Sequence, residues 1–222
     1  MDETNKKLFD AAAQGDVRLV EVCVREGADV NVVNGEQRTA LMRSAKRGHI
    51  DVVRFLVQEG AEVGALDIFG KDAMMSAAKK GHLDIVKLLL KHGADPKLRD
   101  YKGRSALMRA CFLGYDEIVD ELIAAGADVN TGDKMGRTPL MESVNAGRFF
   151  ITKALIRHGA DLNAQDHNGC TALMRACYAG SEPMITYLIN HGADKELKDI
   201  EGNLAIHYIR QDNFDALKRH LK

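Results

Sequence analysis

A repeat of 33 residues governs how this chain of 222 residues can fold. Three residue series keep that step in one register: a Gly-Ala-Asp/Glu triplet, a second glycine and an aspartate. The triplet begins at Gly27, Gly60, Gly93, Gly126, Gly159 and Gly192, the second glycine is Gly15, Gly48, Gly81, Gly114, Gly147 and Gly180, and the aspartate is Asp67, Asp100, Asp133, Asp166 and Asp199. A fixed period of this length is typical of a repeat protein and decides the fold class.

Each repeat predicts a turn followed by two helices, as residues 100–132 illustrate. The segment opens with turn residues, and Ser105 can cap the N-terminus of a first helix. Gly114 is suited to ending that helix and Gly126 to ending the second, because glycine adopts the left-handed conformation of a helix C-terminus. Apolar residues at helical spacing lie between these signals.

One such helix pair cannot bury its apolar face alone, so neighbouring repeats must stack to form a core. A small residue recurs at one buried position of the first helix, which permits close helix packing. Its members are Ala77, Ala110, Ser143 and Ala176. The pattern predicts an all-α solenoid of stacked helix-turn-helix repeats.

The chain resembles the ankyrin repeat family. Its T-P-L-H-x-A signature is matched at 138–143, with degenerate forms at 39–44, 105–110 and 171–176, and G-A-D-V-N is complete at 27–31 and 126–130. Methionine replaces the signature histidine, a variant similar to that of many bacterial members. The resemblance implies a right-curving solenoid with β-hairpin or turn fingers, and recognition of other proteins through fingers and inner helices that line a concave face.

We predict one ankyrin-repeat domain over residues 1–222, with no further domain. The predicted boundaries are an N-terminal capping repeat, 1–33, full repeats 34–66, 67–99, 100–132, 133–165 and 166–198, and a C-terminal capping repeat, 199–222. Gln37 stands where the turn glycine of the first finger is expected, so we expect that finger to be distorted.

Composition and motifs argue against catalysis, cofactors and membranes. The formal net charge is −1, the sequence has no phosphate-binding, zinc-protease or nucleophile-elbow motif, and no apolar run is long enough to span a bilayer. Histidines at equivalent repeat positions lie roughly 10 Å apart, too far to share a metal ion. We therefore predict no enzyme activity, no catalytic residue, no cofactor and no metal site.

The four cysteines lack C-x-x-C spacing and indicate reduced thiols, hence a cytoplasmic protein. An exported or periplasmic location remains the alternative if a signal peptide was removed before residue 1. We expect a monomer in the absence of a partner.

Candidate partner-binding residues lie at the fingers and at the ends of the inner helices. They are apolar or aromatic where solvent favours polar groups, or basic at recurring positions. The set is Phe69, Lys71, Lys79, Tyr101, Lys102, Arg104, Arg109, Phe112, Leu113, Met135, Arg137, Arg175 and Tyr178. One alternative is that one or two of the aromatic residues only pack between neighbouring fingers.

These residues predict a groove with aromatic anchors and a basic rim, suited to a protein with an acidic exposed surface. We expect a stoichiometric inhibitor or adaptor that acts by occupancy. The alternatives are an exported, host-directed or periplasmic protein that binds and protects against or regulates an enzyme, and, with less support, an enzyme or a nucleic-acid binder. The low net charge disfavours binding to nucleic acid or membranes.

Overall fold

The computed structural model describes residues 2–221, which form two compact units. The first unit comprises residues 2–109 and 124–126, and the second comprises residues 110–123 and 127–221. The outermost residues of the two predicted capping repeats, Met1 and Lys222, lie outside the described residues. The prediction of one domain with the repeat boundaries given above stays a prediction.

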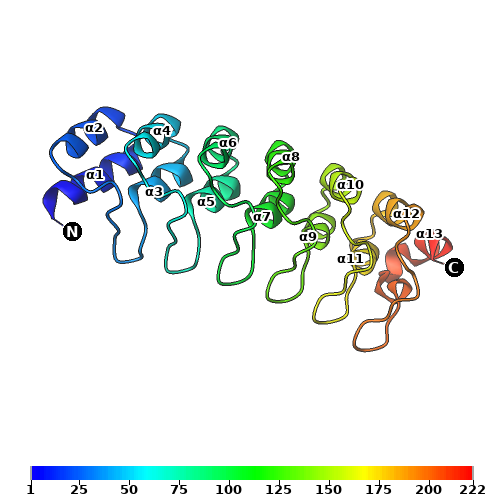
Figure 1. Ribbon diagram of the computed structural model, residues 1–222. Helices are drawn as coiled ribbons and strands as arrows, with labels where there is room; N and C mark the ends of the chain where they lie inside the picture. The colour runs from blue at the N-terminus through cyan, green and yellow to red at the C-terminus, as the bar shows by residue number, and fades with distance from the viewer. Residues whose placement is uncertain (1, 222) are drawn as a thin grey trace. The chain divides into compact units, whose positions relative to one another are not determined.

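The first unit holds three helix pairs, in which the first helix of each pair is inner and the second is outer (Figure 1). They are α1 (Glu3–Gln14) with α2 (Val17–Arg25), α3 (Ala40–Arg47) with α4 (Ile50–Gln58), and α5 (Ala73–Lys80) with α6 (Leu83–Lys91). Inner helix α3 packs between α1 and α5, and outer helix α4 packs between α2 and α6. Loops that we call fingers precede the inner helices from α3 onward (Figure 1).

The boundary between the units falls within α7 (Ala106–Leu113) and α8 (Asp116–Ala124). The second unit continues with the pairs α9 (Pro139–Asn145) with α10 (Phe149–Arg157) and α11 (Ala172–Ala179) with α12 (Glu182–Asn190). Its last part is four short helices: η1 (Ala205–Tyr208), η2 (Gln211–Asn213), α13 (Phe214–Leu217) and η3 (Lys218–His220). Residues 2–221 contain two isolated antiparallel bridges and no sheet, so the predicted all-α repeat fold is confirmed.

The inner helices begin where the sequence predicts. The side chains of Thr39, Ser105, Thr138 and Thr171 each accept a hydrogen bond from the backbone N–H three residues later, at 3.2–3.3 Å. This satisfies one of the free donors of the first helical turn. The small residues predicted at one inner position are fully buried, as Ala77, Ala110, Ser143 and Ala176 show.

Asparagine side chains join neighbouring repeats at the C-terminal ends of the outer helices. Asn130 donates from Nδ2 to the carbonyl of Gly159 at 3.0 Å and accepts from the N–H of Asp161 at 2.7 Å. Asn31 makes the same pair of bonds to Gly60 and Glu62. The asparagine of the G-A-D-V-N motif therefore clamps the end of one outer helix to the next repeat.

The first finger keeps the geometry of the others, so the expected distortion is wrong. Gln37 donates its N–H to the carbonyl of Asn34 at 2.9 Å, as Gly70 does to Asp67 at 2.8 Å. The finger achieves this because Gln37 adopts φ 55°. A residue with a Cβ pays roughly 1–2 kcal/mol in that left-handed region.

We predict that Gln37→Gly raises the free energy of unfolding by about 0.5–1 kcal/mol. The relief of strain exceeds the greater backbone entropy that glycine has in the unfolded chain. Urea denaturation of the two proteins measures the difference. As the reverse control, Gly202→Gln should lower stability by about 1 kcal/mol, because Gly202 has φ 85° and open space around its Cβ position. Equal stability of wild type and Gln37→Gly would contradict the strain.

Asp72 caps α5, whereas α3, α7, α9 and α11 use threonine or serine. Its Oδ1 accepts from the N–H of Met75 at 2.7 Å, while its buried Oδ2 has no hydrogen-bond partner among residues 2–221. Burial raises the pKa of the Asp72 carboxyl to about 6, although the Met75 hydrogen bond opposes this shift. An unfolded aspartate has a pKa of about 3.9. The folded protein therefore binds an extra proton between these two values.

We predict that the Asp72 carboxyl makes stability fall as the pH rises from about 4 to about 6. The contribution is full below the unfolded pKa and is lost above the folded one, and it amounts to about 2–3 kcal/mol. Asp72→Thr keeps the cap and should be more stable than wild type at pH 7 but not at pH 4. Urea denaturation at pH 4, 5, 6 and 7 tests this. Parallel pH profiles of the two proteins would contradict it.

Candidate functional site

The fingers are ordered by a buried aspartate that accepts from two backbone N–H groups. In the third finger, Oδ1 of Asp100 accepts from the N–H groups of Lys102 and Arg104, each at 2.9 Å. The same arrangement occurs at Asp67, Asp133, Asp166 and Asp199. Each of these aspartates therefore satisfies two amides of its own finger.

Successive fingers within a unit are joined by a backbone hydrogen bond at their tips. Tyr101 donates its N–H to the carbonyl of Phe69 at 2.9 Å in the first unit, and His167 donates to Met135 at 2.9 Å in the second. These bonds fix the spacing of the side chains that the fingers carry.

The second oxygen of each finger aspartate takes a positively charged or hydroxyl partner. Asp100 pairs with Arg109, Asp166 with Arg175, and Asp133 with Arg137 at 2.6 Å. Asp67 pairs at 3.4 Å with Arg38 of the preceding finger, and Asp199 accepts from the Tyr208 hydroxyl at 2.6 Å. The fingers therefore neutralise much of the basic charge that the sequence places near them.

The buried pair of Asp100 and Arg109 shows the electrostatic balance. Burial alone would raise the pKa of Asp100, but the hydrogen bond from the N–H of Arg104 and the charge of Arg109 outweigh it and lower the pKa. The Asp100 carboxylate is thus stabilised in its charged form, and its partner is held in place.

This pairing corrects the prediction that Arg109 and Arg175 form a free basic rim. The Arg109 side chain is only 9% exposed and the Arg175 side chain 23%, and each is bound to the aspartate of its own finger. Arg104 and Arg137 are also paired, with Asp100 and Asp133. These four arginines support the fingers instead of offering free charge.

A group of free cations lies on α3 and α5 of the first unit. Arg43, Lys46, Arg47, Lys79 and Lys80 have no ion-pair partner among residues 2–221, and all but the half-buried Arg43 are exposed. Their positions are the outward face and last turn of the inner helices. Of these residues the sequence analysis selected only Lys79 for the partner-binding set.

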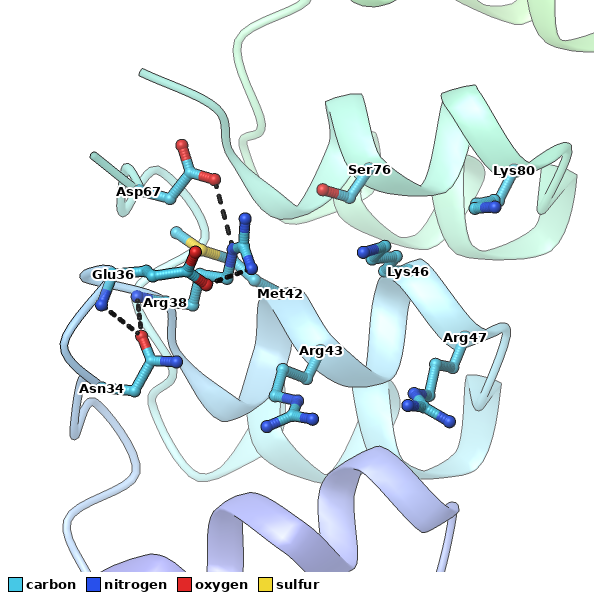
Figure 2. A pocket seen from close by; sticks show the side chains of 10 residues that line it. All are labelled: Asn34, Glu36, Arg38, Met42, Arg43, Lys46, Arg47, Asp67, Ser76 and Lys80. Atoms are coloured by element: carbon cyan, nitrogen blue, oxygen red, sulfur yellow. Dashed lines mark hydrogen bonds and ion pairs between the residues drawn. The ribbon is translucent and has the colours of Figure 1, made fainter. Parts of the chain in front are cut away.

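Four of these cations, Arg43, Lys46, Arg47 and Lys80, line a pocket of about 440 Å³, which we call the basic pocket (Figure 2). Its lining is Asn34, Glu36, Arg38, Met42, Arg43, Lys46, Arg47, Asp67, Ser76 and Lys80. Figure 2 shows the ion-paired residues at one end and Lys46, Lys80 and Ser76 at the other, with Arg43 and Arg47 along the edge of α3. The pocket has the size of a small-ligand site and a surplus of positive charge.

Electrostatic repulsion between neighbouring cations also shows in the pKa values of two lysines of the first unit. Partial burial lowers the pKa of Lys79, and the nearby charges of Arg109, Lys80 and Lys46 lower it further. Lys71 behaves similarly: partial burial and Arg109 lower its pKa, against the opposing pull of Asp67 and Asp100. The positive charges of the first unit are therefore close enough to one another to favour an anion.

Two predicted aromatic residues lie on fingers of the first unit. Phe69 is 45% exposed, with the ammonium of Lys71 4.9 Å from its ring centroid. Tyr101 is 60% exposed, but one side of its ring lies against the backbone of Gly70. Tyr101 thus combines the two interpretations made from the sequence, because it packs on the neighbouring finger and still presents a free face.

The second unit presents apolar groups in place of the cations. Phe112 is 44% exposed and Tyr178 65%, both in the last turn of an inner helix, and Met135 is 51% exposed on a finger. Leu113 is half-buried. We call Phe112, Met135 and Tyr178 the apolar set.

Lys102, in the third finger and thus in the first unit, is exposed. The partner-binding role of all these residues stays a prediction.

The most exposed aromatic residue, Phe150 on outer helix α10, was absent from the predicted site. It is 75% exposed and borders a hollow of about 390 Å³ beside Asp120, Lys153 and Arg157. Its neighbour Phe149 packs edge-on against Tyr187, with ring centroids 5.5 Å apart. The sequence carried a signal for this residue: adjacent side chains such as Phe149 and Phe150 cannot both point to the buried face of an amphipathic helix, so one ring must face outward.

Two histidines make hydrogen bonds to the backbone of the preceding repeat, and the cysteines form no disulfide. His49 and His82 bond through Nε2 to the carbonyls of Ala13 and Lys46, at 3.1 and 3.3 Å. All four cysteines are free thiols, and burial raises the pKa of Cys177 to about 12. Residues 2–221 contain no group of three or more His, Cys, Asp or Glu side chains placed to bind a metal ion. Within the same residues, every helix is too short or too polar to cross a membrane.

Comparison with known proteins agrees with this geometry. A family model described as ankyrin repeats (3 copies) matches residues 8–100, 59–133, 107–199 and 141–218. The crystal structure of the human ASB11 ankyrin repeat domain is similar, with TM-score 0.86, 24% identity and coverage of 96% of each chain. The ankyrin repeat domain of Bcl-3, described as a unique member of the IkappaB protein family, gives TM-score 0.83 at 31% identity, covering 96% of this chain and 97% of that one. No curated protein matches the sequence significantly.

Proposed function

Because the chain belongs to the ankyrin repeat family, whose repeats are protein–protein interaction modules, we propose that it acts by occupying the surface of one protein target. In this proposal it is a stoichiometric inhibitor or an adaptor. The residues predicted from the sequence on fingers and inner helices are its contacts. The similar ankyrin repeat domain of Bcl-3 is described as a unique member of the IkappaB protein family.

The observation that carries the proposal is the exposure of the apolar set. Phe112, Met135 and Tyr178 leave between 44% and 65% of their surface in solvent. Large aromatic side chains dominate the energy of protein interfaces when a partner covers them. Such exposure has no stabilising role in the free protein.

Charge supports an acidic partner surface. The free cations of α3 and α5 have no counter-ions among residues 2–221, whereas the arginines near the fingers already have them. Complementary charge speeds encounter and fixes register more than it adds affinity. We also propose a cytoplasmic location, which the four free cysteines support.

An enzyme and a nucleic-acid binder remain the rival functions. The buried finger carboxylates, such as Asp100, are engaged by finger amides and arginines, and the buried Asp72 carboxyl caps α5. Turnover of any substrate by the pure protein would favour an enzyme. A steep dependence of oligonucleotide binding on salt would favour a nucleic-acid binder.

We predict that Phe112→Ala and Tyr178→Ala each weaken partner binding by about 1–2 kcal/mol and leave the melting temperature nearly unchanged. The protein is immobilised and the captured partner is quantified by mass spectrometry and titration. Phe150→Ala is the matched control, since it removes an even more exposed ring from an outer helix. Capture that depends on Phe150 and not on the apolar set would contradict this placement of the site.

Core substitution should have the opposite effect. Leu107 is completely buried in α7, so Leu107→Ala should lower the free energy of unfolding by about 2–5 kcal/mol. At a temperature where the variant stays folded, it should still bind the partner. Thermal denaturation followed by circular dichroism, paired with the same capture assay, separates the two effects. A normal melting temperature for Leu107→Ala would show that the repeat core is assigned wrongly.

A further inference from the structure

The basic pocket arises from two departures from the repeat pattern in adjacent repeats. One inner-helix position is occupied by Arg43, Ser76, Arg109, Glu142 and Arg175 in successive repeats. Arg109 and Arg175 extend from this position to the aspartate of their own finger. In α5 the position holds Ser76, so the space that a long side chain fills elsewhere is open.

The second departure is Asn34, which occupies the aspartate position of the first finger. It still accepts from the N–H groups of Glu36 and Arg38, at 2.9 and 3.0 Å, so the finger is ordered. As a neutral amide it offers no charge to Arg43. The Arg43 guanidinium lies 4.7 Å from the ring centroid of Phe9 instead, without an ion pair.

Together these departures leave a hollow with unbalanced charge. Its lining contains the cations Arg38, Arg43, Lys46, Arg47 and Lys80 and the anions Glu36 and Asp67. The two anions are both bound to Arg38, so the surplus belongs to the other four cations. Within residues 2–221, the Ser76 hydroxyl, half-buried beside Lys46, makes no hydrogen bond comparable to that of Ser143 with the Leu140 carbonyl.

We propose that the basic pocket binds a phosphorylated serine or threonine side chain of the protein partner, an inference that rests on the proposed function. The phosphoryl group lies between the Ser76 hydroxyl and the ammonium groups of Lys46 and Lys80. Arg43 and Arg47 take acidic residues that flank it.

A phosphate fits this site better than a carboxylate. It carries a charge of about −1.5 to −2 at pH 7 and presents three strong acceptor oxygens. One carboxylate supplies a single charge to a lining with several free donors. A long polyanion is less suited, because the whole chain has net charge −1.

The probes are three degenerate peptide libraries whose central residue is phosphoserine, serine or glutamate, offered to the full chain. Peptides selected from them are titrated by fluorescence anisotropy. We expect the phosphoserine form to bind about 10-fold or more tighter than its serine form, as charge-assisted hydrogen bonds do. Equal binding of the glutamate form would mean that a carboxylate suffices and would overturn the proposal.

Ser76→Arg separates a shaped pocket from general attraction. The arginine should fill the hollow and pair with Asp67, as Arg109 does with Asp100, and so weaken phosphopeptide binding about 10-fold although the protein gains a positive charge. Ser76→Ala, which keeps the hollow, should retain most of the affinity. Unchanged or tighter binding by Ser76→Arg would overturn the site.

Charge variants provide the matched comparison. Asn34→Asp should capture Arg43 and weaken binding, whereas Gln58→Glu on outer helix α4 alters the net charge equally and should not. Lys46→Ala should weaken binding several-fold more than Lys91→Ala, which removes the same charge from outer helix α6. If both variants of a pair lose the same affinity, only net charge matters and the site is overturned. If a single-stranded oligonucleotide binds more tightly than any phosphopeptide, the ligand is nucleic acid and not a protein partner.

The outcomes distinguish the two proposals. If a protein is captured through Phe112 and Tyr178 while the phosphoserine library shows no preference, the basic pocket is assigned wrongly and the proposed function stands. If phosphopeptides bind as described but no protein is captured through the apolar set, the pocket stands and the occupancy function fails.

Discussion

The buried finger carboxylate is the interaction on which the rest of this structure depends. One oxygen of Asp100, for example, orders the finger backbone, and the other holds Arg109 almost completely out of solvent. A buried charge is tolerated only when it is paired and hydrogen-bonded. Each repeat with a finger aspartate must therefore supply a partner for it, and that requirement decides which basic residues remain free to meet another molecule.

The partner comes from a different place in different repeats. Asp133 uses Arg137 of its own finger, Asp166 uses an inner-helix arginine, and Asp67 uses Arg38 from the finger before it. The fold is insensitive to this choice, because each solution completes the same carboxylate. The surface is sensitive to it: an arginine recruited from a finger leaves the inner helix free to carry a small residue such as Ser76.

The sequence predicts the repeated features well and the pairing poorly. Helix caps such as Thr138 and the buried small residues can be predicted from local spacing, because the same pattern recurs in successive repeats. Whether Arg109 faces solvent depends on a carboxylate nine residues away whose orientation the finger sets, and residue type alone does not reveal that. The sequence did contain a signal for the basic pocket, since Asn34 and Ser76 both differ from the residue that most repeats carry at the equivalent position. That the two differences together create a pocket becomes visible only in the structure, where both residues line it.

Net charge conceals this specialisation. A total of −1 suggests a surface without preference, yet the inner helices α3 and α5 end in Lys46-Arg47 and Lys79-Lys80, while the corresponding turns in the second unit carry Phe112 and Tyr178. Exchanging residues at the last turn of an inner helix changes none of the buried contacts that stack the repeats. A repeat fold can therefore place different recognition chemistry on each repeat, and the basic pocket and the apolar set are two products of that freedom.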